Sequence, residues 1–300
     1  MTKKYTPIKD KTGFITVKNK PSFKELERHY NDLYFSDEKH RPLNYQENYD
    51  NDELNHINLM NDLCLYSLEK IRPKWRKKPG SMLEVGAGEG FMLSRSMAKG
   101  WDVLGIDYNS FGIEKFNPHV LEKSKFGNAF EILIDLKKNK TKFDVCVMQN
   151  VLEHVVNPRE LLTNIKKLIK SRGIIVIRIP NDYSKTQLLA LKMGYIKEKF
   201  WYAPPEHLNY FNAENVGKFM KEMKLKILDM YSSFPIDFFI FHSGSNYVKQ
   251  KKNGKEVHKA RVHLDLLMAY NGIENYHKLY QSMSLCGVGR NLTLILEKSD

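Results

Sequence analysis

The sequence predicts an α/β protein with a doubly wound parallel sheet, and three observations lead to this fold class. The apolar run Met82–Val85 breaks into glycines at alternate positions and then continues as a helical pattern. Strand-like and helix-like segments alternate from there to about residue 231. A last apolar strand, Asn291–Glu297, follows a long insertion that begins at residue 232.

Size and charge limit the protein class without naming a partner. Three hundred residues, 42% of them hydrophobic, suit one large domain or one domain with an appended cap. The formal net charge is +13, carried mostly by lysine. Lysine on solvated faces is the favoured explanation of this charge, and an anionic substrate or a nucleic acid is the alternative.

Cysteine usage and the N-terminal residues indicate neither a disulfide scaffold nor a membrane protein. The three cysteines lie far apart, and Cys64 and Cys146 fall in apolar patterns typical of core positions. The first twenty residues are polar and basic, and no later apolar run has the length of a membrane span. We expect a cytoplasmic protein.

The N-terminal part is expected to form a cap, residues 1–52, over the ligand edge of the sheet. Residues Tyr5–Lys18 are expected to form either a short hairpin, with its turn near Gly13, or a loose arm, and a helix is expected over Pro21–Tyr34. A further helix is predicted from Leu54 to Ile71 by apolar residues three and four positions apart, namely Leu54, Ile57, Met60, Cys64, Leu68 and Ile71.

The core is expected over residues 53–231, with residues 290–300 as its final strand. One helix has clear boundary signals, with Asn157 as its cap, Pro158 at its first position, Glu160 in its first turn and Gly173 at its end. Shorter helices are expected near residues 110–117, from Ala129, and around Val216–Met223. The strands are expected at Met82–Val85, Trp101–Asp107, Lys123–Asn128, Phe143–Met148, Ile174–Ile179 and Lys226–Met230.

The insertion, residues 232–289, is expected to hold two helices and to act as a substrate lid. Its basic stretch Lys249–Lys255, with Lys259 and Arg261 beyond it, is either a solvated loop or a site for a phosphate or a nucleotide-sugar diphosphate. Neighbouring aromatic residues are candidates for lining the lid, namely Phe238, Phe239, Phe241 and Tyr247.

The glycine loop predicts a nucleotide-like ligand. Glycines at 86, 88 and 90 allow positive φ and close approach of a ligand, and the helix that follows presents free N–H groups to an anionic group. A dinucleotide fingerprint requires its third glycine at position 91, where the chain has Phe91. The acid at Asp107 suits the ribose of a dinucleotide or of an adenosyl group, so it does not discriminate between them.

Four segments together resemble a class I S-adenosylmethionine-dependent methyltransferase. They are Leu83–Gly90 (LEVGAGEG), Gly105–Asp107 (GID), Phe143–Val155 (FDVCVMQNVLEHV) and Gly173–Ile177 (GIIVI). The similarity covers roughly residues 54–231 and is strongest to the branch of ubiquinone/menaquinone-biosynthesis and saccharide-tailoring O-methyltransferases. It implies seven strands in the order 3-2-1-4-5-7-6, with an antiparallel last strand.

The resemblance also implies roles for individual residues. Asp107 would accept both ribose hydroxyls of the cofactor, a geometry that suits a carboxylate. Tyr108 would flank the adenine, and Asn128 with Ala129 would contact the adenine edge, although many relatives have an acid at the position of Asn128. The remaining residues expected at the methionine part and the methyl group are Glu84, Gly86, Ala87, Gly88, Gly90, Phe91, Gln149 and Asn150.

Two histidines are the candidates for a general base, because imidazole titrates near neutrality. His154 follows the fourth strand and His207 follows the crossover after the fifth strand. Each has a structural alternative, in fixing a loop or docking a helix. Glu153, Tyr202 and Glu206 are substrate-contact candidates. Because Gln149 and Asn150 are neutral, where some relatives bind a metal through carboxylates, no metal is expected.

The predicted function is transfer of a methyl group from S-adenosylmethionine to an oxygen of a small molecule, leaving S-adenosylhomocysteine. A sugar or surface-glycan precursor is favoured over a quinone-like phenol, which places the protein in carbohydrate biosynthesis. An RNA substrate is disfavoured because Gln149–Leu152 lacks the Asn/Asp-Pro-Pro-aromatic element of base-methylating enzymes. A non-catalytic binding protein and an anionic acceptor stay open, as does the choice between monomer and homodimer.

Overall fold

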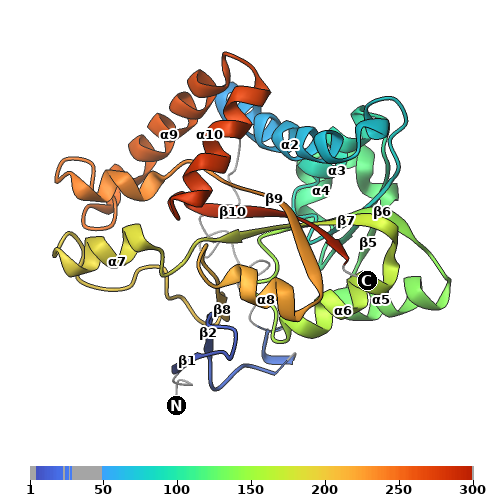
Figure 1. The fold of residues 1–300 in the computed structure, drawn as a ribbon, viewed down its shortest axis with the longest axis horizontal. Coiled ribbons are helices and arrows are strands. Elements are labelled where there is room, and N and C mark those ends of the chain that lie inside the picture. Colours follow the sequence, from blue (N-terminus) through green and yellow to red (C-terminus); the bar gives the residue numbers. More distant parts are fainter. Residues whose placement is uncertain (1–4, 23, 27, 29–48, 299–300) are drawn as a thin grey trace.

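The computed structural model describes residues 5–22, 24–26, 28 and 49–298. Its centre is a seven-stranded sheet with the strand order β5-β4-β3-β6-β7-β10-β9 (Figure 1). The first five of these strands run parallel, and β10 runs antiparallel to both of its neighbours. The predicted fold class and the predicted strand order 3-2-1-4-5-7-6 are therefore confirmed.

The sheet strands are β3 (Ser81–Val85), β4 (Asp102–Asp107), β5 (Ser124–Phe126), β6 (Phe143–Gln149), β7 (Ile169–Pro180), β9 (Leu225–Ser232) and β10 (Asn291–Lys298). The helices are α2 (Asn51–Ile71), α3 (Phe91–Ala98), α4 (Phe111–Phe116), α5 (Ala129–Lys138), α6 (Pro158–Leu168), α7 (Lys185–Lys192), α8 (Val216–Glu222), α9 (Gly254–Ala269) and α10 (Ile273–Leu285). Short 3₁₀ turns lie at Pro73–Arg76, Pro118–Lys123, Ile236–Phe241 and Lys251–Asn253.

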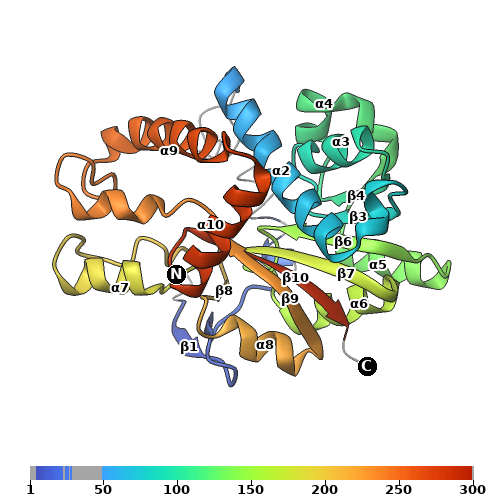
Figure 2. The same ribbon diagram turned by 45° about the horizontal axis from the view of Figure 1, so that its top comes forward.

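Two apolar cores cover the two faces of the sheet, because successive side chains of a strand point to opposite sides. Leu83 belongs to the core under α5, α6 and α8, whereas its neighbour Met82 belongs to the core under α2, α3 and α10 (Figures 1 and 2). Both residues are completely buried. Cys64 and Cys146 are buried in these cores as predicted, and Cys286 is exposed.

The N-terminal hairpin is present and belongs to a second, smaller sheet. Strands β1 (Pro7–Lys9) and β2 (Ile15–Val17) pair antiparallel, and β2 pairs with β8 (Asn209–Tyr210). Phe14, in the hairpin, packs on Phe211 with ring centroids 4.4 Å apart, which ties the hairpin to the core. The helix expected at residues 21–34 falls largely outside the described residues, and the predicted domain boundaries stay predictions.

The expectation that Gly173 ends a helix is wrong. The helix begins as predicted, with the side chain of Asn157 accepting a hydrogen bond from the Glu160 N–H at 3.2 Å, but it ends at Leu168. Gly173 lies inside β7, where an added Cβ would come within 2.8 Å of the backbone oxygen of Asp144. This glycine is needed because two backbones approach closely, and the sequence pattern alone does not separate that role from a helix end.

Helix boundaries elsewhere were partly missed. The helix expected from Leu54 begins at Asn51, because Asp50 and Glu53 form a reciprocal capping box at 2.9 and 3.0 Å. Helix α7 was not predicted, although Ser184 and Gln187 cap it in the same way. Both capping boxes are local sequence signals, but the polar residues around them made the helix starts difficult to predict.

The insertion between β9 and β10 contains the two predicted helices, α9 and α10. Helix α9 meets α2 at an angle (Figure 2), and His56 of α2 contacts Asp265 of α9 at 2.8 Å. The lysines at 251 and 252 are exposed to solvent, whereas Arg261 faces inward. Within the described residues, none of the helices combines the length and the apolar character that a membrane span requires.

Candidate active site

The glycine loop lies between β3 and α3, at the carboxyl edge of the parallel strands. Gly86, Gly88 and Gly90 have φ values of +76°, +55° and +77°, as the sequence pattern predicted. A Cβ on Gly86 would lie 2.4 Å from Cγ2 of Val151, in the segment after β6, so this glycine allows two loops to touch. A Cβ on Gly88 would meet no described atom within 4 Å, so the loop is open at its centre.

Asp107, the last residue of β4, is held beside this loop. One carboxylate oxygen accepts the N–H of Gly88 at 2.7 Å, and the other accepts the N–H of Tyr108 at 2.7 Å. Burial raises the pKa of Asp107, and the backbone hydrogen bonds oppose that rise. The side chain is therefore fixed in orientation at the edge where the resemblance places the cofactor ribose.

Glu84, on β3, is a buried acid whose Oε2 has no hydrogen-bond partner among the described residues. Burial, together with the nearby charge of Asp107, raises its pKa well above the ordinary range, and a hydrogen bond from Gln149 opposes the rise. An unsatisfied buried carboxyl group is costly, so this position suits a ligand that brings a donor or a positive charge.

The expected adenine contacts lie at the start of α5. The side chain of Asn128 accepts the N–H of Phe130 at 2.9 Å and caps the helix, with Ala129 as the first helical residue. Capping occupies the side-chain oxygen of Asn128 and leaves its amide group to contact a ligand. Tyr108 is 37% exposed and therefore accessible for stacking.

An aromatic cluster that sequence reasoning missed lies beside the loop. The Tyr49 ring makes edge contacts with Phe91 and Phe116, at centroid distances of 5.4 and 5.2 Å. The Tyr49 hydroxyl donates to the carboxylate of Glu89, with oxygens 2.7 and 2.8 Å away. Phe91 thus packs in a cluster that closes one side of the loop. Nothing local in the sequence links Tyr49 to Glu89.

The segment after β6 and the segment after β7 bring three ionisable side chains together. The metal-ligating atoms of Glu153, His154 and His207 all lie within 4.8 Å of one another, and the two histidine rings meet edge to face at 4.8 Å. Glu153 is buried, and neither of its carboxylate oxygens has a hydrogen-bond partner among the described residues. This donor set suits one divalent ion as well as proton transfer, so the absence of a metal stays a prediction.

The other residues predicted near this cluster are placed differently from one another. Nδ1 of His154 donates to the backbone carbonyl of Glu206 at 2.7 Å, so Glu206 contributes through its main chain. The hydroxyl of Tyr202 donates to the carbonyl of Tyr5 in the N-terminal segment, at 3.2 Å. Asn150 is exposed, with φ of +54°.

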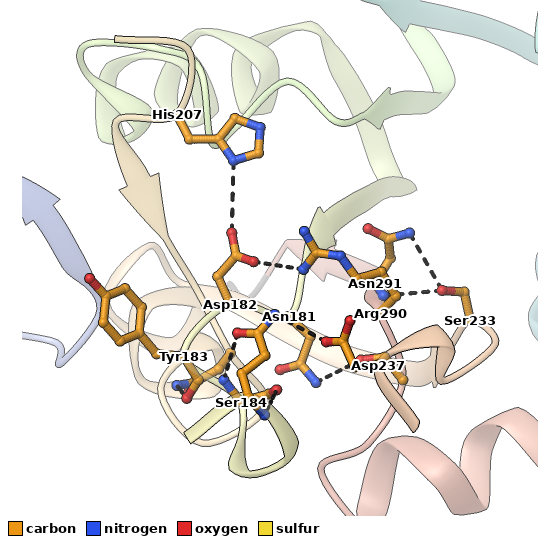
Figure 3. A network of polar contacts seen from close by, with 12 residues as sticks. Asn181, Asp182, Tyr183, Ser184, His207, Ser233, Asp237, Arg290 and Asn291 are labelled. Atoms are coloured by element: carbon orange, nitrogen blue, oxygen red, sulfur yellow. Dashed lines mark hydrogen bonds and ion pairs between the residues drawn. The ribbon is translucent and has the colours of Figure 1, made fainter. Parts of the chain in front are cut away.

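His207 is backed by an ion pair that the sequence did not predict (Figure 3). Its Nδ1 lies 3.8 Å from one oxygen of Asp182, and the other oxygen of Asp182 contacts Nη1 of Arg290 at 2.7 Å. Asp182 follows β7 and Arg290 immediately precedes β10. Their neighbour Asn181 is itself fixed, because its amide donates to the backbone oxygens of Gly287 and Gly289 at 3.1 and 3.0 Å.

These surroundings shift the pKa values of His154 and His207 in opposite directions. Burial, with the neighbouring charge of His207, lowers the pKa of His154 to about 3. Burial alone would lower the pKa of His207, but Asp182 and the charge of Glu153 outweigh it and raise the pKa above the ordinary value. Burial raises the pKa of Glu153 to about 7. The pKa values of His207 and Glu153 are therefore both raised, and the two groups titrate as a coupled pair.

The chain matches the family described as "Methyltransferase domain" over residues 58–229. It belongs to this methyltransferase family. Among curated proteins, it is 29% identical over 127 residues to the ubiquinone biosynthesis O-methyltransferase of Rickettsia bellii (strain OSU 85-389), covering 42% of this chain and 53% of that protein. The chain therefore spans about half the length of this relative.

Two further comparisons agree with the fold and the family. The ubiquinone biosynthesis O-methyltransferase of Actinobacillus pleuropneumoniae serotype 7 (strain AP76) is 32% identical over 187 residues, which cover 56% of this chain and 77% of that protein. Among solved structures, plantazolicin methyltransferase BpumL, in complex with a pentazolic desmethylPZN analogue and S-adenosylhomocysteine, is 19% identical with a TM-score of 0.52, covering 92% of this chain and 96% of that chain. The resemblance to class I S-adenosylmethionine-dependent methyltransferases is confirmed, and the roles of individual residues stay predictions.

Proposed function

We propose that this methyltransferase transfers a methyl group from S-adenosylmethionine to a hydroxyl oxygen of a small molecule. The observation that carries the proposal is the pairing of a fixed carboxylate, Asp107, with an unsatisfied one, Glu84, on either side of an open glycine loop. A ribose and an ammonium group are the two parts of this cofactor that require such acceptors.

The cofactor-binding residues are assigned on that basis. Asp107 would bind the two ribose hydroxyls, and Glu84, with Gln149 beside it, would hold the amino group. Gly88 leaves room for the cofactor chain. When bound, S-adenosylmethionine supplies an electrophilic methyl group, so the protein has mainly to align the acceptor and remove its proton.

His207 is the residue we assign as general base. With Nδ1 directed at Asp182, Nε2 is left to accept the hydroxyl proton of the acceptor. The raised pKa of His207 makes its ring the stronger proton acceptor, whereas the pKa of about 3 at His154 makes that ring a poor one. Asp182 acts as a positioning residue, because it orients the ring and stabilises its charged form.

The acceptor is most consistent with a phenol-type hydroxyl. The relatives named above are ubiquinone biosynthesis O-methyltransferases, which favours a quinone-like phenol over the sugar or glycan precursor expected from sequence. A carbohydrate acceptor gains no support from these relatives and becomes the second candidate. In both cases the nucleophile is a hydroxyl that needs a base.

The first test is calorimetric titration with S-adenosylhomocysteine, with NAD as the comparison ligand. The wild-type protein and an Asp102→Asn control, changed at an exposed position on the same strand, should bind S-adenosylhomocysteine and not NAD. Asp107→Asn should weaken binding by roughly 10- to 100-fold, because about 1.5–3 kcal/mol of charge-assisted hydrogen bonding is lost. Unchanged affinity in Asp107→Asn would remove the basis of the assignment.

A second measurement separates an enzyme from a binding protein. His207→Gln should retain S-adenosylhomocysteine affinity while losing most turnover with a catechol acceptor, since general base catalysis contributes roughly 10²–10⁴-fold. Cofactor binding without turnover of any phenol or sugar in the wild-type protein would favour the non-catalytic alternative.

A further inference from the structure

A row of polar side chains crosses the sheet beside the proposed active site. In the strand register Gln149 of β6 lies beside Arg178 of β7, Arg178 beside Thr293 of β10, and Thr293 beside Tyr231 of β9. All four line one small cavity, which α2 closes with Leu63 and Cys64. The sheet therefore contributes these polar groups, together with the apolar Val176, and the helix side of the cavity is apolar.

Arg178 is the unusual member of this row. Among the described residues (5–22, 24–26, 28 and 49–298), the guanidinium group of Arg178 makes no hydrogen bond or ion pair within contact distance. Burial lowers the pKa of this guanidinium, and more distant acidic groups only partly offset the effect. Arg178 is partly buried and lines the cavity without a direct counter-charge, which distinguishes it from the paired arginines of the same protein.

Asp265 is a buried acid whose charge acts on Arg178, but its carboxylate already binds other donors. Its carboxylate accepts hydrogen bonds from His56 at 2.8 Å, from Tyr276 at 2.8 Å, and from Tyr280. Three donors occupy most of its acceptor capacity, and within the described part of the chain it makes no direct contact with Arg178. The position beside Arg178 is thus left for an acceptor from outside the described chain.

Arg261, on α9, is a second partly buried cation, and its charge interacts with that of Arg178. Its Nε is buried without a hydrogen-bond partner among the described residues, while Nη2 lies 3.1 Å from Nδ1 of His258. Burial lowers the pKa of Arg261, and the positive charge of Arg178 is among the groups that lower it further. The exposed residues Lys251 and Lys252, by contrast, remain in solvent and need no ligand.

Arg178 also lies between the two halves of the proposed active site. Gln149, its neighbour in the sheet, is hydrogen-bonded to Glu84 on the cofactor side. On the side of the histidine cluster, the positive charge of Arg178 opposes the rise in the pKa of Glu153. A group held at Arg178 therefore lies close to the place where the acceptor oxygen must meet both cofactor and base.

We infer that Arg178, supported by Arg261, binds a carboxylate or phosphate group of the methyl acceptor. The acceptor is then an anionic hydroxy compound, oriented by a charge pair at one end and by His207 at its reactive hydroxyl. The inference rests on the proposed methyltransferase function and narrows its substrate class. The hydroxyls of Thr293 and Ser233 at the same cavity supply neutral donors for the remaining oxygens.

The test compares Arg178→Met and Arg178→Lys with a Lys251→Gln/Lys252→Gln double variant, which removes exposed positive charge from the insertion. Each protein is saturated with S-adenosylhomocysteine and titrated with inorganic phosphate, with benzoate, and with neutral benzamide. In wild type and the double variant, phosphate or benzoate should bind at least tenfold more tightly than benzamide. Arg178→Met should lose that preference, Arg178→Lys should keep part of it, and the better anion identifies the acceptor group.

The melting temperature of each variant, measured without added anion, shows whether a loss of anion binding comes from unfolding. Arg178→Met should melt at or above the wild-type temperature, because an unpaired inward-facing charge is replaced by an apolar chain. The inference is overturned if wild type shows no anion preference, if the preference survives in Arg178→Met, or if the double variant loses it equally.

The affinity for S-adenosylhomocysteine distinguishes failure of the inferred anion site from failure of the proposed methyltransferase function. A tenfold loss of S-adenosylhomocysteine affinity in Arg178→Met would assign the arginine to the cofactor carboxylate and overturn the inference alone. Failure of wild type to bind S-adenosylhomocysteine would instead refute the proposed function. Retained cofactor binding in Arg178→Met, with loss of anion preference, is the expected result.

Discussion

Replacing Asp182 by Asn tests the assignment of His207 as the base most directly. The substitution keeps the size of the side chain but removes the negative charge 3.8 Å from Nδ1 of His207. At that distance, with an effective dielectric constant of about 20, one unit charge is worth about 4 kcal/mol. Arg290, 2.7 Å from the same carboxylate, remains in the variant and continues to disfavour the protonated ring, so the change should cost at least about 1.4 kcal/mol, or about one pKa unit.

The sign of the effect follows from the direction of the shift. Because the pKa of His207 is raised in the folded protein, its stabilising contribution is complete below the unfolded value near 6.5 and is lost as pH rises through the folded value. Catalysis needs the neutral ring, so wild-type turnover should rise with pH through that same raised pKa. In Asp182→Asn the pKa should fall by about one unit, and the turnover profile should shift to lower pH.

Nuclear magnetic resonance titration of the histidine ring protons measures this pKa without any acceptor. The His207 signal is assigned by its absence in His207→Gln. Asp229→Asn is the matched control, because Asp229 pairs with the buried His277 at 2.7 Å and is not among the main charges that act on His207. That control should lower the melting temperature and leave the His207 titration unchanged. A His207 pKa that does not move in Asp182→Asn, or that moves equally in Asp229→Asn, would refute the reasoning.

Two further predictions concern the glycine loop and the histidine cluster. Gly86→Ala should lower the free energy of unfolding in urea by about 2 kcal/mol or more, because a Cβ there meets Val151 at 2.4 Å and φ is positive. Gly88→Ala, where the space is open, should cost less stability but weaken S-adenosylhomocysteine binding; equal loss of stability in both variants would contradict this. Removal of divalent metal with EDTA should leave turnover unchanged if His207 is the base, and a loss restored by magnesium would show instead that Glu153 and the histidines bind a metal.

Much of the fold could be predicted because its signals are local. The hydrophobic periodicity and the glycine loop identified the core strands, and the boundary residues of α6 identified its start. The prediction for Gly173 was wrong because the role of this glycine depends on the backbone of Asp144, in a neighbouring strand, rather than on adjacent residues. Strand β8 was missed because its two residues form a strand only through pairing with the hairpin.

Site residues could be predicted where they contact nearby backbone, and they were missed where their role depends on a partner distant in sequence. Asp107 could be found because it ends a strand and binds the nearby backbone of Gly88. Asp182 and Arg290 are 108 residues apart in sequence, and neither lies in a recognisable motif. Arg178 occurs within an apolar strand, where a single charged residue gives no indication of the cavity it lines.

The insertion between β9 and β10 connects these missed residues to acceptor choice. It carries Arg261 on α9, and the chain returns from α10 to the sheet through Arg290, which holds Asp182 in place. The same α9 is fixed to α2 by Asp265, so movement of the insertion would displace the second cationic group relative to Arg178. The cofactor contacts proposed for Glu84, Gly88 and Asp107 lie on other elements. Changes within the insertion are therefore expected to alter acceptor specificity and base strength while leaving cofactor affinity intact.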